Sequence, residues 1–476
     1  MKKQVTTLRS LILVATLAAC SGLIAVVASA QTPPSAQAKE QPPAPGPSRP
    51  FELAPRTHYV LPNGTQVNLL EFGTVPKVSI EIDEAAGRVN EDPQHIDLSA
   101  ITAELMGEGT AKRTGEELAR QAGDMGSTLS IQGGVYQSSF SIDVLSGGAA
   151  EAISLLAEVI EQPAFPAKDL ERLRADHLRS RATSLANPGF LARQAFEQLM
   201  YGDQAYGRLL PTEAMLKSYT LNDVRSFYAA NYGSQRTAIY VVGRFDERAV
   251  RAAIDKSFSG WARGPAPQMP VQTAVSGAHF AFVDQPGAAQ SNVIYGIVVP
   301  DVASPDATQL SVMNLLLGGS FGSRITSNIR EQKGYTYSPR SSLSQGYGTN
   351  VWAENAAITT VSTGPAIQEI VKEIKRLQDA PPTAAELGGI QRYEDGVFVL
   401  RNSSRGGILN NLSFVDFHHL SDDYLTGYVQ RVDAVTPDQV QAMAKKYLNT
   451  DAMSLAVVGD PTIVKPQLSG FAATAK

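Results

Sequence analysis

Two stretches of 24 residues decide the fold, because they repeat one pattern 216 residues apart. They read TLNDVRSFYAANYGSQRTAIYVVG (residues 220–243) and TPDQVQAMAKKYLNTDAMSLAVVG (residues 436–459). Each opens with Thr followed three residues later by Asp or Gln, which predicts a capped helix N-terminus. Each ends in an apolar run before Gly, which predicts a strand. We therefore expect one helix-to-strand unit to occur twice in the chain.

Two further pairs of residues are also 216 positions apart. Gly148 and Gly364 each precede a predicted helix, AAEAISLLAEVI in one case and PAIQEIVKEIKRL in the other. Pro166 and Pro382 each precede the next helix. Four landmarks at one offset indicate an internal duplication.

The two copies are predicted to be α+β halves of similar design. Each is read as a strand pair, a helix, a strand pair, a helix, a long helix, a helix and a strand, with helices packed on a mainly antiparallel sheet. The linker GPAPQMP (residues 264–270) is rich in Pro and Gly and separates them. We therefore assign residues 51–263 to an N-terminal half and residues 271–476 to a C-terminal half.

The N-terminus predicts export. A basic start (residues 1–9), an apolar stretch (residues 11–27) and Ala-Ser-Ala at 28–30 form the pattern of a signal peptide. Cleavage after Ala30 and lipoprotein processing before Cys20, within LAAC, both stay open, and an uncleaved anchor is a third interpretation. All three imply an exported, periplasmic protein, with a membrane link only through this N-terminus.

Composition narrows the function classes. Residues 31–50 are rich in Pro, Ala and Gln and predict a flexible tether. The net charge of −5 and pI near 5.8 argue against a nucleic-acid binder, which carries a basic footprint. Cys20 is the only cysteine, so the mature chain is expected to be stable without disulfides.

With these features the chain resembles the pitrilysin/insulinase family of zinc peptidases, which includes the mitochondrial processing peptidase subunits. The resemblance covers roughly residues 51–465. It depends on the duplicated order of elements and on ELMGEGT (104–110), AFPAKDLERLR (164–174) and FYAANY (227–232). It implies that the two halves form a clam-like chamber together with a partner.

The zinc motif of the family is missing. Active members carry H-x-x-E-H, whose histidines hold zinc and whose glutamate acts as the base, with a further glutamate on a later long helix. Aligned on ELMGEGT, this motif falls on Ala100–Glu104, and the further ligand is expected near Arg179–Arg181. No carboxylate lies at the latter position, and we predict no metal site in this chain.

The six histidines do not offer a substitute motif. His177 is predicted to lie on a solvated helix face, and His418-His419 in a solvated polar turn at a helix end. Adjacent helical residues point about 100° apart, so the latter pair shares no face.

The resemblance assigns a different role to GGSFGSRITSNIREQKGYTYS (residues 318–338). In the family, an Arg and a Tyr of the C-terminal half reach the active site, and the pattern places them at Arg330 and Tyr337. A guanidinium and a phenol can donate hydrogen bonds to a carbonyl oxygen that becomes an oxyanion. The alternative is structural: Arg330 pairs with the carboxylate of Glu331, and Tyr337 lies in the core.

Three functions stay open. The first is a zinc-free subunit whose Arg330 and Tyr337 complete the site of a homologous partner that carries H-x-x-E-H and zinc, with peptides or unfolded polypeptides as substrate. The second is a peptide-binding or structural scaffold subunit without a catalytic role. The third is a hydrolase with another site, but the one cysteine that could serve as a nucleophile lies in the signal segment.

Overall fold

The computed structural model describes residues 51–472. The predictions for the signal segment, for Cys20 and for the tether over residues 31–50 concern residues outside this range. Between residues 51 and 472, no helix is long and apolar enough to cross a membrane.

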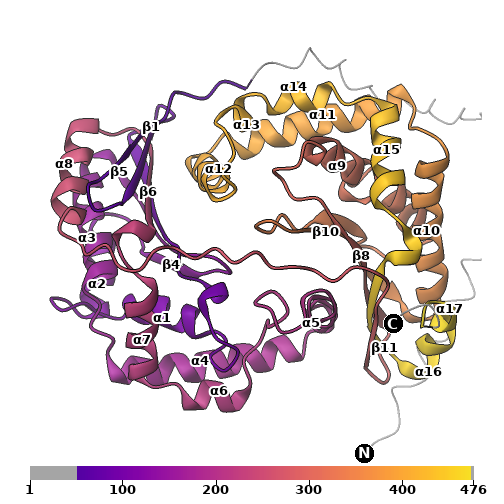
Figure 1. Cartoon of the computed structure of the whole chain (residues 1–476), viewed down its shortest axis with the longest axis horizontal. Helices are drawn as coiled ribbons and strands as arrows, with labels where there is room; N and C mark the ends of the chain where they lie inside the picture. Colours follow the sequence, from indigo (N-terminus) through magenta and orange to yellow (C-terminus); the bar gives the residue numbers. More distant parts are fainter. Residues whose placement is uncertain (1–50, 473–476) are drawn as a thin grey trace, which may run out of the picture. The chain divides into compact units, whose positions relative to one another are not determined.

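Two mixed sheets form the two halves (Figure 1). The strands of the first sheet stand in the order β1 (Thr57–Val60), β2 (Gln66–Glu71), β6 (Thr237–Gly243), β3 (Lys77–Glu84), β5 (Ser138–Leu145), β4 (Ser130–Gly133). Those of the second stand in the order β7 (Phe280–Asp284), β11 (Ser454–Gly459), β8 (Gln290–Val299), β10 (Asn350–Thr359), β9 (Arg340–Leu343). Only β2–β6 and β7–β11 pair in parallel, so the predicted α+β class with mainly antiparallel sheets is confirmed.

Helices fill the connections between these strands. The first half contains α1 (Leu98–Met106), α2 (Gly115–Asp124), α3 (Ala149–Glu161), α4 (Ala167–Leu185), α5 (Pro188–Tyr201), α6 (Glu213–Ser218), α7 (Leu221–Asn231) and α8 (Glu247–Phe258). The second contains α9 (Ala307–Asn314), α10 (Thr363–Asp379), α11 (Ala384–Arg401), α12 (Arg405–Phe417), α13 (Asp423–Thr426), α14 (Tyr428–Asp433), α15 (Pro437–Tyr447), α16 (Pro461–Val464) and α17 (Ser469–Ala472). Two π-helical segments follow α9, Leu315–Gly319 and Thr326–Gln332.

The repeated helix starts are built as the sequence predicts. The side chain of Thr220 accepts a hydrogen bond from the N–H of Asp223, and that of Thr436 accepts one from the N–H of Gln439. Both caps include the reciprocal contact from the third residue, which satisfies two backbone donors at each helix end. β6 and β11 then return to the middle of their sheets.

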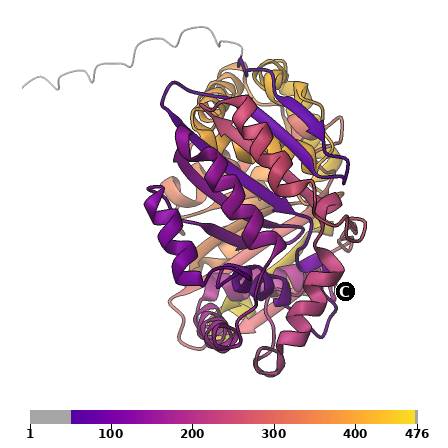
Figure 2. The same cartoon turned by 90° about the vertical axis from the view of Figure 1, so that its left-hand side faces the viewer.

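The two faces of the first sheet differ in character. Val78, Ile80 and Ile82 of β3 are fully buried in the core formed with α1, α3, α7 and α8. In Figure 2 the helices of this half face the viewer. Because side chains alternate along a strand, Ser79, Glu81 and Asp83 point to the opposite face. That second face is the one that meets the other half of the chain.

The halves exchange one helix each. α12 of the second half packs on β6 and β3 of the first sheet, while α5 of the first half packs on the second sheet, mainly on β11 (Figure 1). The two helices occupy corresponding places in the repeat. Ile408 and Leu412 of α12 cluster with Tyr240, and Phe196 of α5 clusters with Val458. Each sheet is therefore completed by a helix from the other copy.

Polar contacts fix the exchanged α12. Arg405 donates to the Asp143 carboxylate at 2.8 Å, and Ser413 donates to Asp83 at 2.7 Å. Arg56, which precedes β1, pairs with Asp416 at 2.7 Å. These contacts set the position of α12 along the polar face of the sheet.

Candidate functional site

The start of α1 is held by a buried carboxylate. Glu91 accepts hydrogen bonds from the backbone N–H of Asp97 and from both the N–H and the hydroxyl of Ser99. It thereby satisfies donors that a helix N-terminus leaves free. Asp97, the cap residue, has a φ of 76°, a conformation that Asp tolerates better than most residues. The side chain of Asp97 is left free to contact α4.

Asp97 and Glu104 meet one histidine of α4. The Nδ1 atom of His177 lies 2.7 Å from Asp97 Oδ2, and its Nε2 atom lies 3.0 Å from Glu104 Oε2. Only 14% of the His177 side chain is exposed. The imidazole thus links the two ends of α1 to the middle of α4.

This geometry favours the charged imidazolium. Burial alone would lower the pKa of His177, but the hydrogen bonds to Asp97 and Glu104 outweigh it and raise the pKa to about 10. With both carboxylates ionised, each ring nitrogen carries a proton and donates it. Such a ring has no lone pair for a metal ion or for proton abstraction near neutral pH.

Two predictions about this region are wrong. His177 does not lie on a solvated helix face, because two carboxylates from α1 and its cap enclose it. The α4 residue that faces Glu104 is His177 and not the Arg179–Arg181 stretch. Arg179 instead pairs with Asp176 and leaves 70% of its side chain exposed. The residue that faces Glu104 therefore lies two residues before the predicted stretch.

The predicted Arg330 lies on a π-helical segment. It belongs to Thr326–Gln332, and π-helical turns are rare and frequent at functional sites. Its guanidinium lies over the ring of Phe321, 4.4 Å from the ring centroid, and its Nε lies 3.2 Å from a Glu331 carboxylate oxygen. The pairing with Glu331 that the structural alternative requires is therefore present.

Tyr337 points away from the core. Tyr335 packs against the second core, and the Thr336 hydroxyl donates to the carbonyl of Ala357 on β10 at 2.6 Å. The next residue, Tyr337, is 80% exposed. The alternative in which Tyr337 is a core residue is wrong, and its hydroxyl stands on a backbone anchored to β10.

The two regions do not touch each other. Within residues 51–472 no hydrogen bond or ion pair joins Arg330 or Tyr337 to Glu104 or His177. The chain therefore presents the predicted Arg/Tyr pair and the metal position of its own first half as separate features.

The two histidines at the end of α12 differ, because His418 is buried whereas His419 is exposed. His418 is 8% exposed and contacts the rings of Phe414 and Phe417. Burial lowers its pKa to about 4, so it stays neutral near neutral pH. The prediction of a solvated turn is wrong for His418, because the rings of Phe414 and Phe417 on α12 cover its imidazole.

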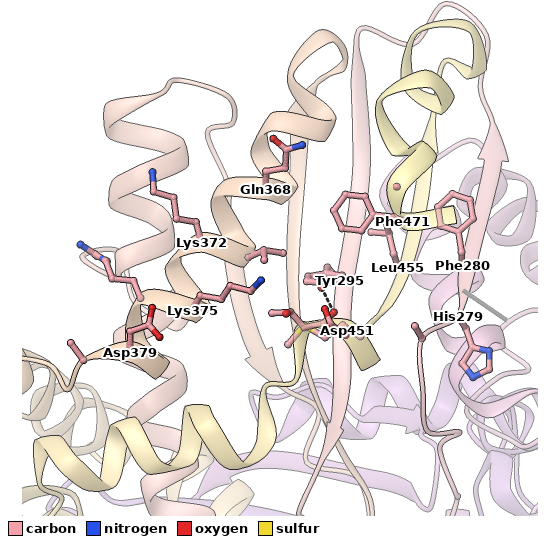
Figure 3. A pocket seen from close by; sticks show the side chains of 17 residues that line it. His279, Phe280, Tyr295, Gln368, Lys372, Lys375, Asp379, Asp451, Leu455 and Phe471 are labelled. Atoms are coloured by element: carbon pink, nitrogen blue, oxygen red, sulfur yellow. Dashed lines mark hydrogen bonds between the residues drawn. The ribbon is translucent and has the colours of Figure 1, made fainter. Parts of the chain in front are cut away.

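A cavity of about 780 Å³ lies elsewhere, between α10 and the strands of the second sheet (Figure 3). Lys375 points into it beside an apolar wall that includes Phe280 and Phe471. Lys372, Arg376, Asp379 and Asp451 also line this space, so it carries charges of both signs. None of the candidate site residues lines it.

The sequence interpretation missed Glu81 and Asp83. Both lie on the polar face of β3, where burial raises the pKa of each carboxyl. The signal was present in VSIEIDEAAG, whose alternation puts two acidic residues on one face of a strand.

The fold and these sites define a duplicated peptidase-like protein. Residues 70–210 match the family described as Insulinase (Peptidase family M16), and residues 218–393 match the one described as Peptidase M16 inactive domain. The chain belongs to the M16 (insulinase/pitrilysin) peptidase family.

Relatives with similar sequences and folds are known. The chain is 23% identical over 411 residues to an uncharacterized zinc protease of Streptomyces coelicolor, across 84% of this chain and 88% of that one. The structure of a peptidase M16 inactive domain from Pseudomonas fluorescens has a TM-score of 0.78 at 23% identity and covers 85% of this chain and 98% of that chain. The periplasmic protease PqqL from Escherichia coli has a TM-score of 0.73 at 17% identity, over 87% of this chain and 46% of that chain.

Zinc, which the names of such relatives imply, does not fit the residues at this position. Ala100 and Ala103 have no ligand atoms, and His177 donates directly to Glu104. The described part of the chain holds no group of three His, Cys, Asp or Glu side chains that could bind a metal ion. The side chains bind one another where active family members bind the metal.

Proposed function

We propose that this chain is a zinc-free subunit of an exported M16 peptidase, and that it supplies Arg330 and Tyr337 to a homologous partner. The partner carries H-x-x-E-H and provides zinc, water and the base. Tyr337 and Arg330 donate hydrogen bonds to the carbonyl oxygen of the scissile peptide as negative charge develops on it. The substrate is a peptide or an unfolded polypeptide.

The hydrogen bond from His177 to Glu104 carries the proposal. It occupies the family's metal position with an ion pair, so hydrolysis that depends on zinc requires a second chain. The imidazolium is held on both sides and cannot easily turn away, because either carboxylate would lose a charge-assisted partner. A catalytic role for the first half of this chain is therefore disfavoured.

The segment around Tyr337 supports the second part of the proposal. An exposed tyrosine hydroxyl on an anchored backbone is available to a molecule outside the chain, and Thr336 limits its freedom. Donors that are positioned before the reaction are worth the most in transition-state stabilisation. The partner's substrate would meet a phenol whose hydroxyl has no hydrogen-bond partner among residues 51–472.

The alternative is a peptide-binding or structural scaffold subunit. Arg330 favours it, since Glu331 and Phe321 already engage its guanidinium within the chain. In that case the Arg/Tyr pair is a remnant, and its substitution leaves the complex unaffected.

Export is part of the same proposal. A periplasmic subunit begins at Gln31 after signal-peptide cleavage, or at a lipidated Cys20. The mass of the mature protein distinguishes the two. A full-length chain that keeps Met1 and remains in the cytoplasm would refute both.

The proposal is tested by purifying the tagged chain from its native host under mild conditions. We expect a homologous chain with H-x-x-E-H to copurify, and the complex to cleave an unstructured peptide until a chelator is added. The chain expressed alone is expected to hold less than stoichiometric zinc and to cleave nothing. One tightly bound zinc per isolated chain, lost by chelation together with activity, would overturn the proposal.

A further inference from the structure

The polar face of the first sheet contains a further cavity, about 380 Å³ in volume. It lies beside α12 and reaches from β3 across β5 to β4. Its lining consists of Glu81 together with three serines, two glutamines and one asparagine. No apolar or basic side chain lines it, which sets it apart from the larger cavity of the second half.

Glu81 is the one lining residue with an ionisable side chain. In the part of the chain that the structure describes, no hydrogen bond or ion pair engages its carboxyl. Burial, together with the charge of Asp83 on the same face, raises its pKa to about 8. A cation beside this carboxyl would stabilise its ionised form, because the positive charge would offset both the desolvation penalty and the repulsion by Asp83.

The neighbouring groups are already engaged. Asp83 accepts hydrogen bonds from Ser139 at 2.5 Å and from Ser413 at 2.7 Å. The only basic side chain on the adjacent part of α12, Arg405, is bound to Asp143. Within residues 51–472, no basic side chain therefore pairs with Glu81.

We propose that this cavity binds the ammonium or guanidinium group of a lysine or arginine side chain in a bound polypeptide. The carboxylate of Glu81 pairs with the cation, and the surrounding hydroxyl and amide oxygens accept its remaining N–H groups.

The position of β4 favours a polypeptide over a free amine. β4 is the edge strand of the first sheet, and its Gln132 lines the cavity. An extended segment that pairs with a free strand edge places alternate side chains over the sheet face. A basic side chain at one such position would enter the space above Glu81.

Binding of the cation is coupled to proton release. At pH 7 the empty site holds Glu81 mostly protonated, and a bound cation favours the carboxylate, so up to one proton leaves per ligand bound. Affinity rises with pH toward about 8 and then levels off. The other charged or titratable groups on this face include Lys77 and Asp83 on β3, Tyr240 on β6, Asp143 on β5, and Arg405 and Asp416 on α12, and Lys77 pairs with Asp143 at 2.6 Å.

The proposal rests on the proposed function only for the presence of a polypeptide, because binding is measured on this chain alone and without hydrolysis. Calorimetric titration at pH 7 compares a nine-residue unstructured peptide that contains one central arginine with the same peptide that contains norleucine. We expect the arginine peptide to bind about tenfold more tightly or better, as one charge-assisted interaction allows. Repetition in buffers of different ionisation enthalpy should give close to one proton released per peptide, and almost none at pH 9.5.

Glu81→Gln is expected to remove both the preference for arginine and the proton release. Its fold is expected to be unchanged or more stable above pH 4.5, because the variant removes a buried carboxyl whose pKa is raised. Glu247→Gln, on the outer helix α8, is the matched control and should behave as wild type. Equal affinity of the two peptides, or a preference that survives Glu81→Gln, would overturn the proposal. So would tight binding of spermidine with no preference among peptides, since it would assign the site to free polyamines.

Discussion

The metal position of the first half and the Arg/Tyr segment of the second half differ in whether their polar groups are bound within the chain. At the first, Glu104, His177 and Asp97 satisfy one another within 3.0 Å, and little remains for a ligand. At the second, Tyr337 keeps its hydroxyl in solvent on a backbone anchored to β10. The side chains at the first position are bound to one another, whereas the tyrosine hydroxyl at the second is available to a ligand.

The comparison shows how a metal position can lose its ligands while the fold around it stays intact. Removing zinc ligands alone would leave carboxylates near one another and without a counter-charge. An imidazolium supplies positive charge between α1 and α4, where the family's metal would supply it. No compensating charge is required at Tyr337, because an exposed phenol imposes no desolvation penalty on the folded chain.

The largest expected effect is a return of metal binding to the first half. Ala100→His, Glu104→His and His177→Glu together restore the ligand types of the family at the positions that face one another. Histidines four residues apart lie on one helix face. We expect the triple variant to bind one zinc per chain, by metal analysis after dialysis, and wild type to bind none. A folded triple variant that still excludes zinc would show that α1 and α4 do not present these positions as a ligand set.

A smaller effect is expected from loss of the imidazolium. His177→Leu leaves Asp97 and Glu104 without their shared partner, and should lower the free energy of unfolding by about 2 kcal/mol at pH 6, as for lost hydrogen bonds to charged groups. Denaturant titration measures this. Arg179→Gln, two residues along the same helix in an exposed ion pair, is the control and should change stability by less than about 0.5 kcal/mol. Equal effects of the two substitutions would contradict the account of this cluster.

The same cluster predicts a pH dependence. The pKa of His177 is raised from its ordinary value of 6.5 to about 10 in the folded chain, so its contribution is complete below about pH 6.5 and is lost as pH rises through about 10. The difference in unfolding free energy between wild type and His177→Leu should therefore shrink between pH 6 and pH 10.5. A difference that stays constant over this range would mean that the imidazolium does not hold the two carboxylates.

The smallest effect on stability is expected in the Arg/Tyr segment. Tyr337→Phe removes a hydroxyl that faces solvent, and should change the unfolding free energy by less than about 0.5 kcal/mol. Arg330→Gln should cost up to about 1 kcal/mol, because the stacking on Phe321 is lost as well. Thermal unfolding of both variants beside His177→Leu tests the contrast between the regions. If Tyr337→Phe lowers stability as much as His177→Leu does, the proposed difference between the two regions is contradicted.

The fold could be predicted because the duplication is visible in short sequence patterns, namely helix caps and apolar runs. Thr220 and Thr436 start helices by the same cap, and the apolar runs that follow them form β6 and β11. These signals depend on neighbours in sequence. The exchange of α5 and α12 could not be predicted, since it depends on which sheet face each helix meets, and the partner strands lie far away in the sequence.

The site was predictable only in part. Arg330 and Tyr337 lie within one short motif, so their placement needed no tertiary information. The pairing of Glu104 with His177 joins residues 73 positions apart, and it depends on the rotation of α4 about its axis. A shift of two residues rotates a helical position by about 200°, so the predicted position at Arg179–Arg181 does not face Glu104.

The central claim is that this chain contributes Tyr337 to a reaction whose metal lies in another chain. The direct test is the rate of peptide hydrolysis by the reconstituted complex with wild-type chain or with Tyr337→Phe, while assembly is followed separately by gel filtration. We predict a loss of about 10²–10³ in turnover, as for removal of one oxyanion donor, with the complex intact. Unaltered turnover in an intact complex would contradict the claim and favour the scaffold subunit.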